Sequence, residues 1–291
     1  LYDTASPPKI SLTARLVSTG EQPRILWIDG VGLAGDDSRG ILGLGLIEDP
    51  KLLQEKALKK ITGSLGKFLA GQAGPMNDGR ERRFDPKIVY HSPRLHLDRK
   101  GALAVLPFLN DSAMRNAGEI IALDFVRQLA RNSSFDIIEP GVVRQKLLNF
   151  RIIMPEGPSL QDIDALFETL GVDLILTGQV LDYENHEGPW ARPRADFFVS
   201  VFERKSRKVV WSSRSSNAGD DRVFFFDYGL ISTAEVLVSK MVRSIAWSMG
   251  GKPGRPLKDN DEPQNAREHD DQGEKNNYFN NLLFRASTSP W

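Results

Sequence analysis

The sequence contains one long internal repeat, and this repeat limits the fold more than any other feature. Residues 27–66 match residues 211–250 without a gap, so that Trp211 follows Trp27 by 184 residues. The same offset holds from one end of the match to the other. Solenoid and propeller repeats have periods of about 20–50 residues. The spacing therefore predicts a duplicated domain and not a stacked array.

The second copy carries the signals of a complete α/β domain. Its first apolar run is typical of a strand covered on both faces, and Pro107 is expected near the end of that strand because proline cannot donate to a ladder. The expected elements are a strand at 101–109, a helix after Asn116, a strand at 135–138, helices at 140–148 and 159–170, a strand at 172–180, a hairpin of 197–202 and 208–213, and a helix at 232–250. This order predicts an α/β fold in which helices flank a mixed sheet.

The first copy lacks the front half of this pattern. Residues 9–28 supply only the hairpin, and residues 49–65 supply only the last helix. Two strands and one helix bury too little apolar surface to fold alone. We therefore expect this segment to dock on the second copy, on a partner chain or on residues outside this sequence. The expected organisation is a partial copy at 1–70, a linker at 71–98, a complete domain at 99–250 and a polar, largely disordered tail at 251–291.

Composition argues against several classes of function. Lys and Arg equal Asp and Glu at 38 each, which argues against a nucleic-acid binder because such proteins carry a basic face. The absence of cysteine excludes disulfides, cysteine nucleophiles and cysteine-ligated metals. No apolar stretch reaches the roughly 20 residues of a membrane helix. The sequence begins at Leu1 without a signal region, so we expect the true start to have been processed away or to lie upstream.

Several runs of the second copy match the strand and helix motifs of a known domain. They are Ala104-Val-Leu-Pro-Phe108, Asn110-Asp-Ser112, Gly118 to Asp124, Phe135-Asp-Ile-Ile-Glu139, Gly171-Val-Asp-Leu-Ile-Leu-Thr-Gly178 and the late hairpin from Phe202 to Trp211. In these motifs the chain resembles the TolB N-terminal-like and CsgG-type family of bacterial envelope proteins. The resemblance covers about residues 101–250, and the repeat extends it to 9–66.

The resemblance implies an envelope protein that works by binding and assembly. Its relatives include curli-type secretion lipoproteins, exopolysaccharide-export ring proteins and lipoprotein activators of peptidoglycan synthases, and none uses this domain as a catalyst. It also implies a location in the periplasm or at the inner face of the outer membrane. The chain departs from the lipoprotein members because it lacks the cysteine that carries their lipid.

Three sequence features suggest chemistry, and each has a simpler structural interpretation. Gly30-Val-Gly-Leu-Ala-Gly35 fits the dinucleotide pattern, but no helix of the required kind follows it, and the second copy does not keep its first two glycines. The pairs Asp36-Asp37 and Asp220-Asp221 fit a cation site, although Asp in a turn also caps backbone amides. The four histidines, at positions 91, 96, 186 and 269, form no helical zinc pair. We therefore expect no catalytic residue, no cofactor and no metal.

Aromatic residues in loops are the candidates for partner contact. Trp190 lies in a proline-rich polar insertion, so it either anchors a partner or folds back on its own domain. A dense apolar loop follows the hairpin, where polar residues are expected if the loop is only solvated. Its aromatics are Phe224, Phe225, Phe226 and Tyr228. We hypothesise that one of them packs inward and that another meets a neighbouring subunit or the other copy.

These features predict a non-enzymatic structural or assembly component of a bacterial envelope machine, such as a secretion or export system or a periplasmic ring. It acts through protein–protein contacts as a homo-oligomer or within a multi-subunit ring. The alternative is a monomeric periplasmic regulator that binds and activates a cell-wall synthesis enzyme. A third class, a small-molecule binder on a flavodoxin-like sheet, requires a deep polar pocket near the strand ends. Symmetric self-contact separates the first class from the second.

Overall fold

The computed structural model describes most of the chain before the C-terminal tail. The described residues are 7–20, 22–35, 45–72, 81–92, 101–131, 135–150, 158–185, 192–223, 229–231 and 233–250. All of them belong to one compact unit, Leu1–Gly251. The predicted tail at 251–291 lies outside the described residues.

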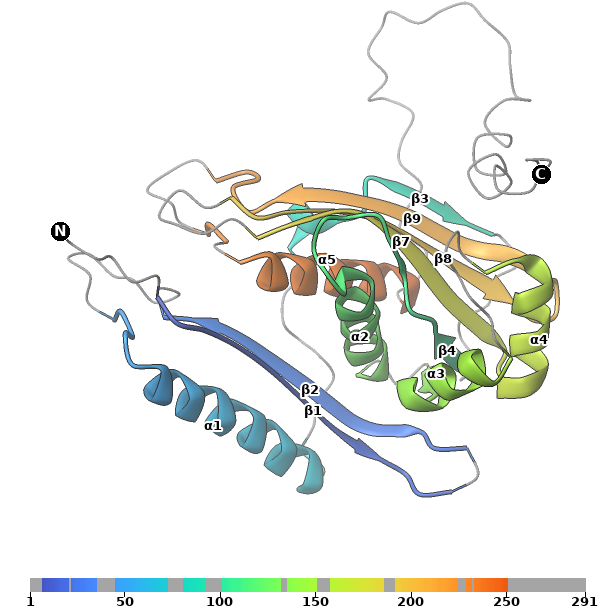
Figure 1. Cartoon of the computed structure of the whole chain (residues 1–291), viewed down its shortest axis with the longest axis horizontal. Coiled ribbons are helices and arrows are strands. Elements are labelled where there is room, and N and C mark those ends of the chain that lie inside the picture. Colours follow the sequence, from blue (N-terminus) through green and yellow to red (C-terminus); the bar gives the residue numbers. More distant parts are fainter. Residues whose placement is uncertain are drawn as a thin grey trace, which may run out of the picture. The chain divides into compact units, whose positions relative to one another are not determined.

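A seven-stranded mixed sheet forms the centre of the described structure (Figure 1). Its strand order is β3-β9-β8-β7-β4-β6, and the short β5 pairs separately with β7. The strands β4 to β7 pair in parallel, whereas β7, β8, β9 and β3 pair antiparallel. The strands are β3 (Ile88–His91), β4 (Gly101–Val105), β5 (Leu109–Asn110), β6 (Phe135–Ile137), β7 (Leu174–Glu184), β8 (Arg194–Glu203) and β9 (Lys208–Ala218). The predicted α/β class with a mixed sheet is confirmed.

Helices cover both faces of this sheet. One face carries α2 and α5, and the other carries α3 and α4. The first face holds the larger core, where the Phe125 ring lies 5.5 Å from that of Phe108 and meets Phe197 edge-on at 6.3 Å. The helices are α2 (Ala117–Ala130), α3 (Pro140–Asn149), α4 (Leu160–Leu170) and α5 (Ala234–Gly250).

Capping signals in the sequence set several helix ends. Ser159 and Asp162 form the predicted capping box at the start of α4. Gly171 ends the same helix in the left-handed conformation, with φ of 58°. Helix α2 begins after Asn116 as expected, but the Asn116 side chain makes no capping hydrogen bond. A side-chain cap therefore does not determine where α2 begins.

The N-terminal segment forms a hairpin covered by one helix, and we call it the first unit. Its strands β1 (Lys9–Val17) and β2 (Ile25–Ala34) pair antiparallel, and α1 (Pro50–Leu69) packs on them. Asp49 caps α1 by accepting a hydrogen bond from the Lys51 N–H at 2.8 Å. The helix turns a narrow apolar face toward the hairpin. The buried residues of that face are Leu53, Ala57 and Ile61.

The first unit docks on the complete domain through β2. Ile25 and Ile28 join the main core beside α2, and Ile28 is only 2% exposed. Gly32 lies beside α5: a Cβ at this position would lie 2.9 Å from the carboxylate at the flexible end of the Glu235 side chain. Of the three docking partners expected from the sequence, the structure shows the second copy.

Polar side chains border this docking contact. Asp29 of β2 forms an ion pair with Arg131 at the end of α2. Ser11 of β1 donates a hydrogen bond to the Glu235 carboxylate of α5 at 2.6 Å. Partly buried pairs of this kind add little net stability, because desolvation offsets much of their attraction, but they disfavour other registers. The apolar contact is therefore the main source of docking stability.

The two units share a local arrangement at the offset found in the sequence. Ala234, where α5 begins, follows Pro50, where α1 begins, by 184 residues. Gly35 and Gly219 are related by the same offset. Each donates to a proline carbonyl at 2.8 Å, and each accepts from an isoleucine N–H, at 2.9 and 3.0 Å. This shared geometry fits a duplication of the domain, which stays a prediction.

Part of the predicted linker at 71–98 is folded. Residues Arg82–Phe84 form the short 3-10 helix η2, and β3 follows it as an edge strand of the main sheet. β3 pairs antiparallel with β9. These elements could not be predicted from the sequence, because runs of three and four residues show no clear periodicity.

Gly219 has no room for a side chain, since a Cβ there would overlap the carbonyl oxygen of Ile231. We expect Gly219→Ala to lower the free energy of unfolding by about 1–3 kcal/mol, the usual cost of overpacking. Gly20→Ala is the matched control, because nothing lies within 4 Å of that Cβ. Urea denaturation followed by circular dichroism measures both variants. Equal stability of the two would contradict the close packing at Gly219.

Asp124 on α2 is buried, and burial raises the pKa of its carboxyl to about 6 despite an ion pair with Arg127. Because the unfolded chain loses this proton near pH 4, stability falls as pH rises from about 4 to about 6, by up to about 3 kcal/mol. Asp124→Asn has no carboxyl at this position, so its stability does not fall with pH for this reason. In urea titrations the variant should therefore gain stability relative to the wild type between about pH 4 and pH 7. A constant difference across that range would rule out the raised pKa.

Candidate interaction surface

The aromatic residues predicted to contact partners lie outside the described residues. They are Trp190, Phe224, Phe225, Phe226 and Tyr228. The structure neither brings them together nor separates them, so their role stays a prediction. The described surface presents other apolar side chains, which the sequence did not single out.

Where they are described, the sequence features that suggested chemistry have structural partners. The Asp221 carboxylate accepts hydrogen bonds from the Ala218 N–H at 3.0 Å and from Asn217 Nδ2 at 2.8 Å, so it caps a turn. The pair Asp36-Asp37 lies outside the described residues. His91 is exposed on β3, and the other histidines are not described. Within the described ranges, no group of three or more His, Asp or Glu side chains is placed to hold a metal ion.

The open edge of the main sheet presents a run of apolar side chains, and we call residues Ile88–His91 the β3 edge. β3 pairs with β9 on one side, and no strand among the described residues pairs with its other side. Ile88, Val89 and Tyr90 are 49%, 48% and 48% exposed. Natural edge strands usually carry a charge that blocks further pairing, and β3 has no Lys, Arg, Asp or Glu. This edge can therefore accept an extended segment of another chain.

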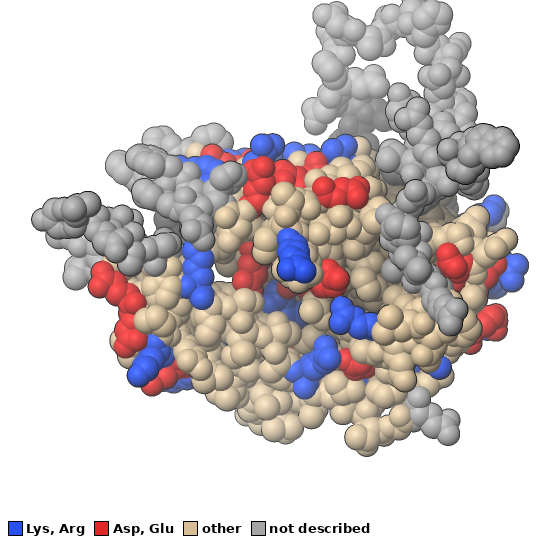
Figure 2. Space-filling view, in the orientation of Figure 1, with Lys and Arg blue, Asp and Glu red and all other residues tan. Residues whose placement is uncertain are grey.

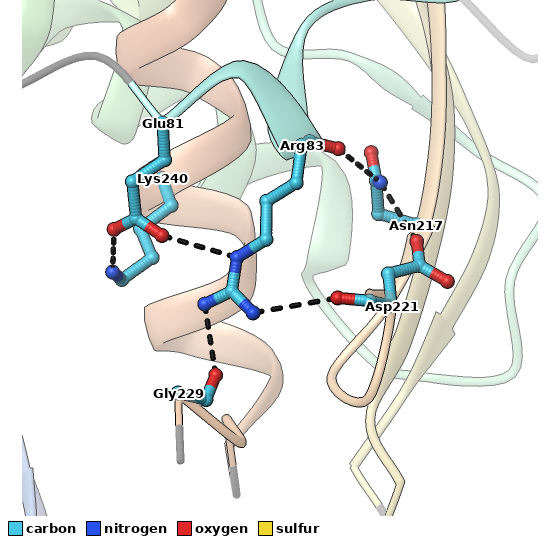
Figure 3. A network of polar contacts seen from close by, with 6 residues as sticks. All are labelled: Glu81, Arg83, Asn217, Asp221, Gly229 and Lys240. Carbon is cyan, nitrogen blue, oxygen red and sulfur yellow. Dashed lines mark hydrogen bonds and ion pairs between the residues drawn. The ribbon is translucent and has the colours of Figure 1, made fainter. Parts of the chain in front are cut away.

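A network of polar contacts holds η2 and β3 on the domain (Figure 3). Arg83 donates to the carbonyl oxygen of Gly229 at 2.8 Å and to that of Asp221 at 3.4 Å. The carbonyl oxygen of Arg83 in turn accepts a hydrogen bond from Asn217 Nδ2 at 3.0 Å. Figure 3 shows these groups converging from η2, from the end of β9 and from the turn before α5. The segment before β3 is thus fixed on three sides.

Glu81 and Phe84 attach the same segment to α5. Glu81 forms ion pairs with Lys240 and with Arg83. Burial raises the pKa of Glu81, but the hydrogen bonds and charges of Lys240 and Arg83 outweigh burial and hold that pKa below its usual value. Phe84 is 1% exposed, and Lys240 Nζ lies 5.7 Å from the centroid of its ring. These contacts present the β3 edge from a rigid support.

Charge is mixed over the face drawn in Figure 2, where Lys and Arg are interspersed with Asp and Glu. The formal net charge of the whole chain is zero at pH 7. A protein without net charge has no long-range repulsion between its copies. No helix in the described ranges is long and apolar enough to cross a membrane.

Comparisons with known proteins give no family assignment. No protein-family model and no curated protein matches the chain. Solved structures that align with it include the PelC dodecamer from Paraburkholderia phytofirmans, with a TM-score of 0.40 and 14% identity over 57% of this chain and 96% of that chain. Lipoprotein GNA1162 from Neisseria meningitidis has a TM-score of 0.35 and 19% identity over 50% of this chain and 97% of that chain.

The LpoB C-terminal domain from Salmonella enterica aligns with a TM-score of 0.31 and 13% identity, over 43% of this chain and 87% of that chain. The expected TolB N-terminal-like or CsgG-type family is not shown by these comparisons. Alignments with such scores carry no argument about function. The function proposed below therefore rests on the described residues and on the sequence motifs.

Phe84→Ala removes the buried ring that attaches η2 to α5. We expect this variant to lose about 3–4 kcal/mol of unfolding free energy, because the cavity adds to the lost burial. Phe150→Ala is the matched control, since Phe150 is 51% exposed. Urea denaturation compares the two variants. If Phe84→Ala proves no less stable than Phe150→Ala, Phe84 does not attach the segment.

Proposed function

We propose that this chain is a non-enzymatic assembly component of a bacterial envelope machine, and that its copies associate through the β3 edge. The observation that carries the proposal is a rigidly supported open strand with three consecutive half-exposed apolar residues. The motifs shared with envelope families support a periplasmic location, with the outer membrane nearby. This arrangement serves binding to other proteins and not catalysis.

A second copy of the chain is the occupant that best fits this edge. Two β3 strands can pair antiparallel about a two-fold axis, and with the axis at Val89 the apolar Ile88 of one copy lies opposite the apolar Tyr90 of the other. The strand contains no Lys, Arg, Asp or Glu whose charge would oppose such pairing. The net charge of zero removes the long-range repulsion that keeps many proteins apart. A monomeric regulator of a cell-wall synthesis enzyme is the alternative, in which the same edge takes a strand of that enzyme.

The polar groups near the edge support a binding role. Glu81 is ionised and paired with Lys240, and Asp221 caps a turn. A general acid must hold a proton near neutral pH, which the ionised Glu81 does not. Both carboxylates are already engaged in structural contacts, Glu81 with Lys240 and Asp221 with the Ala218 N–H.

Native mass tests this proposal, measured by light scattering on a sizing column. We expect the wild-type chain at high concentration to have a mass of at least twice 32.5 kDa. Val89→Lys should be a monomer, because a lysine on an edge strand disfavours further pairing. Leu148→Lys should keep the wild-type mass, because it adds the same charge at a 71% exposed leucine far from β3 in the sequence.

Two outcomes would contradict self-association through β3. A wild-type monomer at high concentration would exclude self-assembly by this chain alone and favour the regulator. An oligomer that persists in Val89→Lys would move the self-contact to another surface. In that case the loop aromatics predicted from the sequence become the next candidates.

A further inference from the structure

Helices α1 and α5 differ in whether another segment of the chain covers their outer side. Both helices pack on a hairpin in the same local arrangement, and their residues correspond at the offset of 184. At this offset Lys56 corresponds to Lys240 and Lys60 to Ser244. The segment containing η2 covers the outer side of α5, whereas no described segment covers that side of α1.

The segment that covers α5 shows which chemical groups this side of the helix binds. Glu81 pairs with Lys240, and the Asp85 carboxylate accepts a hydrogen bond from the Ser244 hydroxyl. Phe84 lies between the two carboxylates in sequence and is 1% exposed. The bound segment is therefore short and contacts α5 with two carboxylates four residues apart around an aromatic ring, while Arg82 and Arg83 between them balance its charge.

The matching side of α1 is basic and exposed. Lys56, Lys60 and Lys67 lie at spacings of four and seven residues, which places them on one stripe of the helix. All three are exposed, and none forms an ion pair with a described carboxylate. Helix α1 contains five lysines and one acidic residue, Glu55. On β2, Trp27 is only half-buried, whereas its counterpart Trp211 is 1% exposed.

We propose that this stripe, the lysine face of α1 (Lys56, Lys60 and Lys67), binds an acidic segment of a partner protein that carries an aromatic residue between its carboxylates. Charge complementarity supports this occupant, and so does the Glu81–Asp85 segment that the chain itself places on the corresponding side of α5. Lys60 stands where α5 has Ser244, so α1 offers a second cation to such a segment. The proposal adds a partner surface to the proposed function and does not depend on the β3 edge.

Binding of a defined peptide tests the lysine face. The probe is a fluorescein-labelled peptide of residues 81–87 with Arg82→Ala, Arg83→Ala and Lys87→Ala, which keeps Glu81, Phe84 and Asp85 but has a net negative charge and lacks β3. Fluorescence anisotropy measures its binding to the full chain. We expect saturable binding that weakens about tenfold or more in Lys56→Glu/Lys60→Glu. The control Lys9→Glu/Lys51→Glu makes the same change in net charge at exposed lysines of β1 and of the other side of α1, and should bind like the wild type.

The remaining arms separate this proposal from its alternatives. A peptide with Glu81→Gln and Asp85→Asn should bind about tenfold more weakly to the wild-type chain if the carboxylates make the contact. Binding that survives in Lys56→Glu/Lys60→Glu would overturn the proposal. So would capture by vesicles containing phosphatidylglycerol without any peptide binding, since the face would then serve an anionic lipid surface. Val89→Lys should leave peptide binding unchanged, so failure of β3 self-association is a distinguishable result.

Discussion

The described structure depends on the burial of α5, because four parts of the chain meet on this helix. One side of α5 packs on β8 and β9 of the main sheet, and another packs on α2. Glu235 accepts a hydrogen bond from β1 of the first unit, and Lys240 pairs with Glu81 of the segment before β3. The residues that it buries in the main core include Leu237, Val238, Met241, Val242 and Ile245. Helix α5 therefore connects the main sheet both with the docked first unit and with the segment that supports the β3 edge.

Much of the fold could be predicted from local signals. The capping box at Ser159 and the helix end at Gly171 could be predicted because each depends on a few adjacent residues. The repeat predicted a second hairpin and helix, and the structure contains both. The docking side could not be predicted, because it depends on Ile25 and Ile28 packing against residues from a distant part of the chain. β9 also runs past its predicted end at 213, because polar residues such as Ser215 continue to pair with β8.

Less of the candidate surface could be predicted. Exposed aromatics in loops attracted attention because their side chains stand out against polar neighbours, yet these residues lie outside the described ranges. Ile88 to Tyr90 form a run too short for a strand signal and fall within a segment rich in Gly, Pro and charge. Their significance comes from pairing with β9, which only the tertiary structure supplies. The lysine face of α1 could be read as a charged helix side, but its likeness to the covered side of α5 required the positions of Glu81 and Asp85.

Amide hydrogen exchange of the full chain, compared between the wild type and Ile28→Asp, tests most directly whether the first unit and the complete domain form one folded body. Ile28 is 2% exposed within the main core, so a carboxylate there disrupts docking. Amides of β2 and α2 should be protected together in the wild type and should lose protection together in the variant. Rapid exchange of β1 and β2 in the wild type, with α2 and α5 still protected, would show that the first unit does not dock and would contradict this structure.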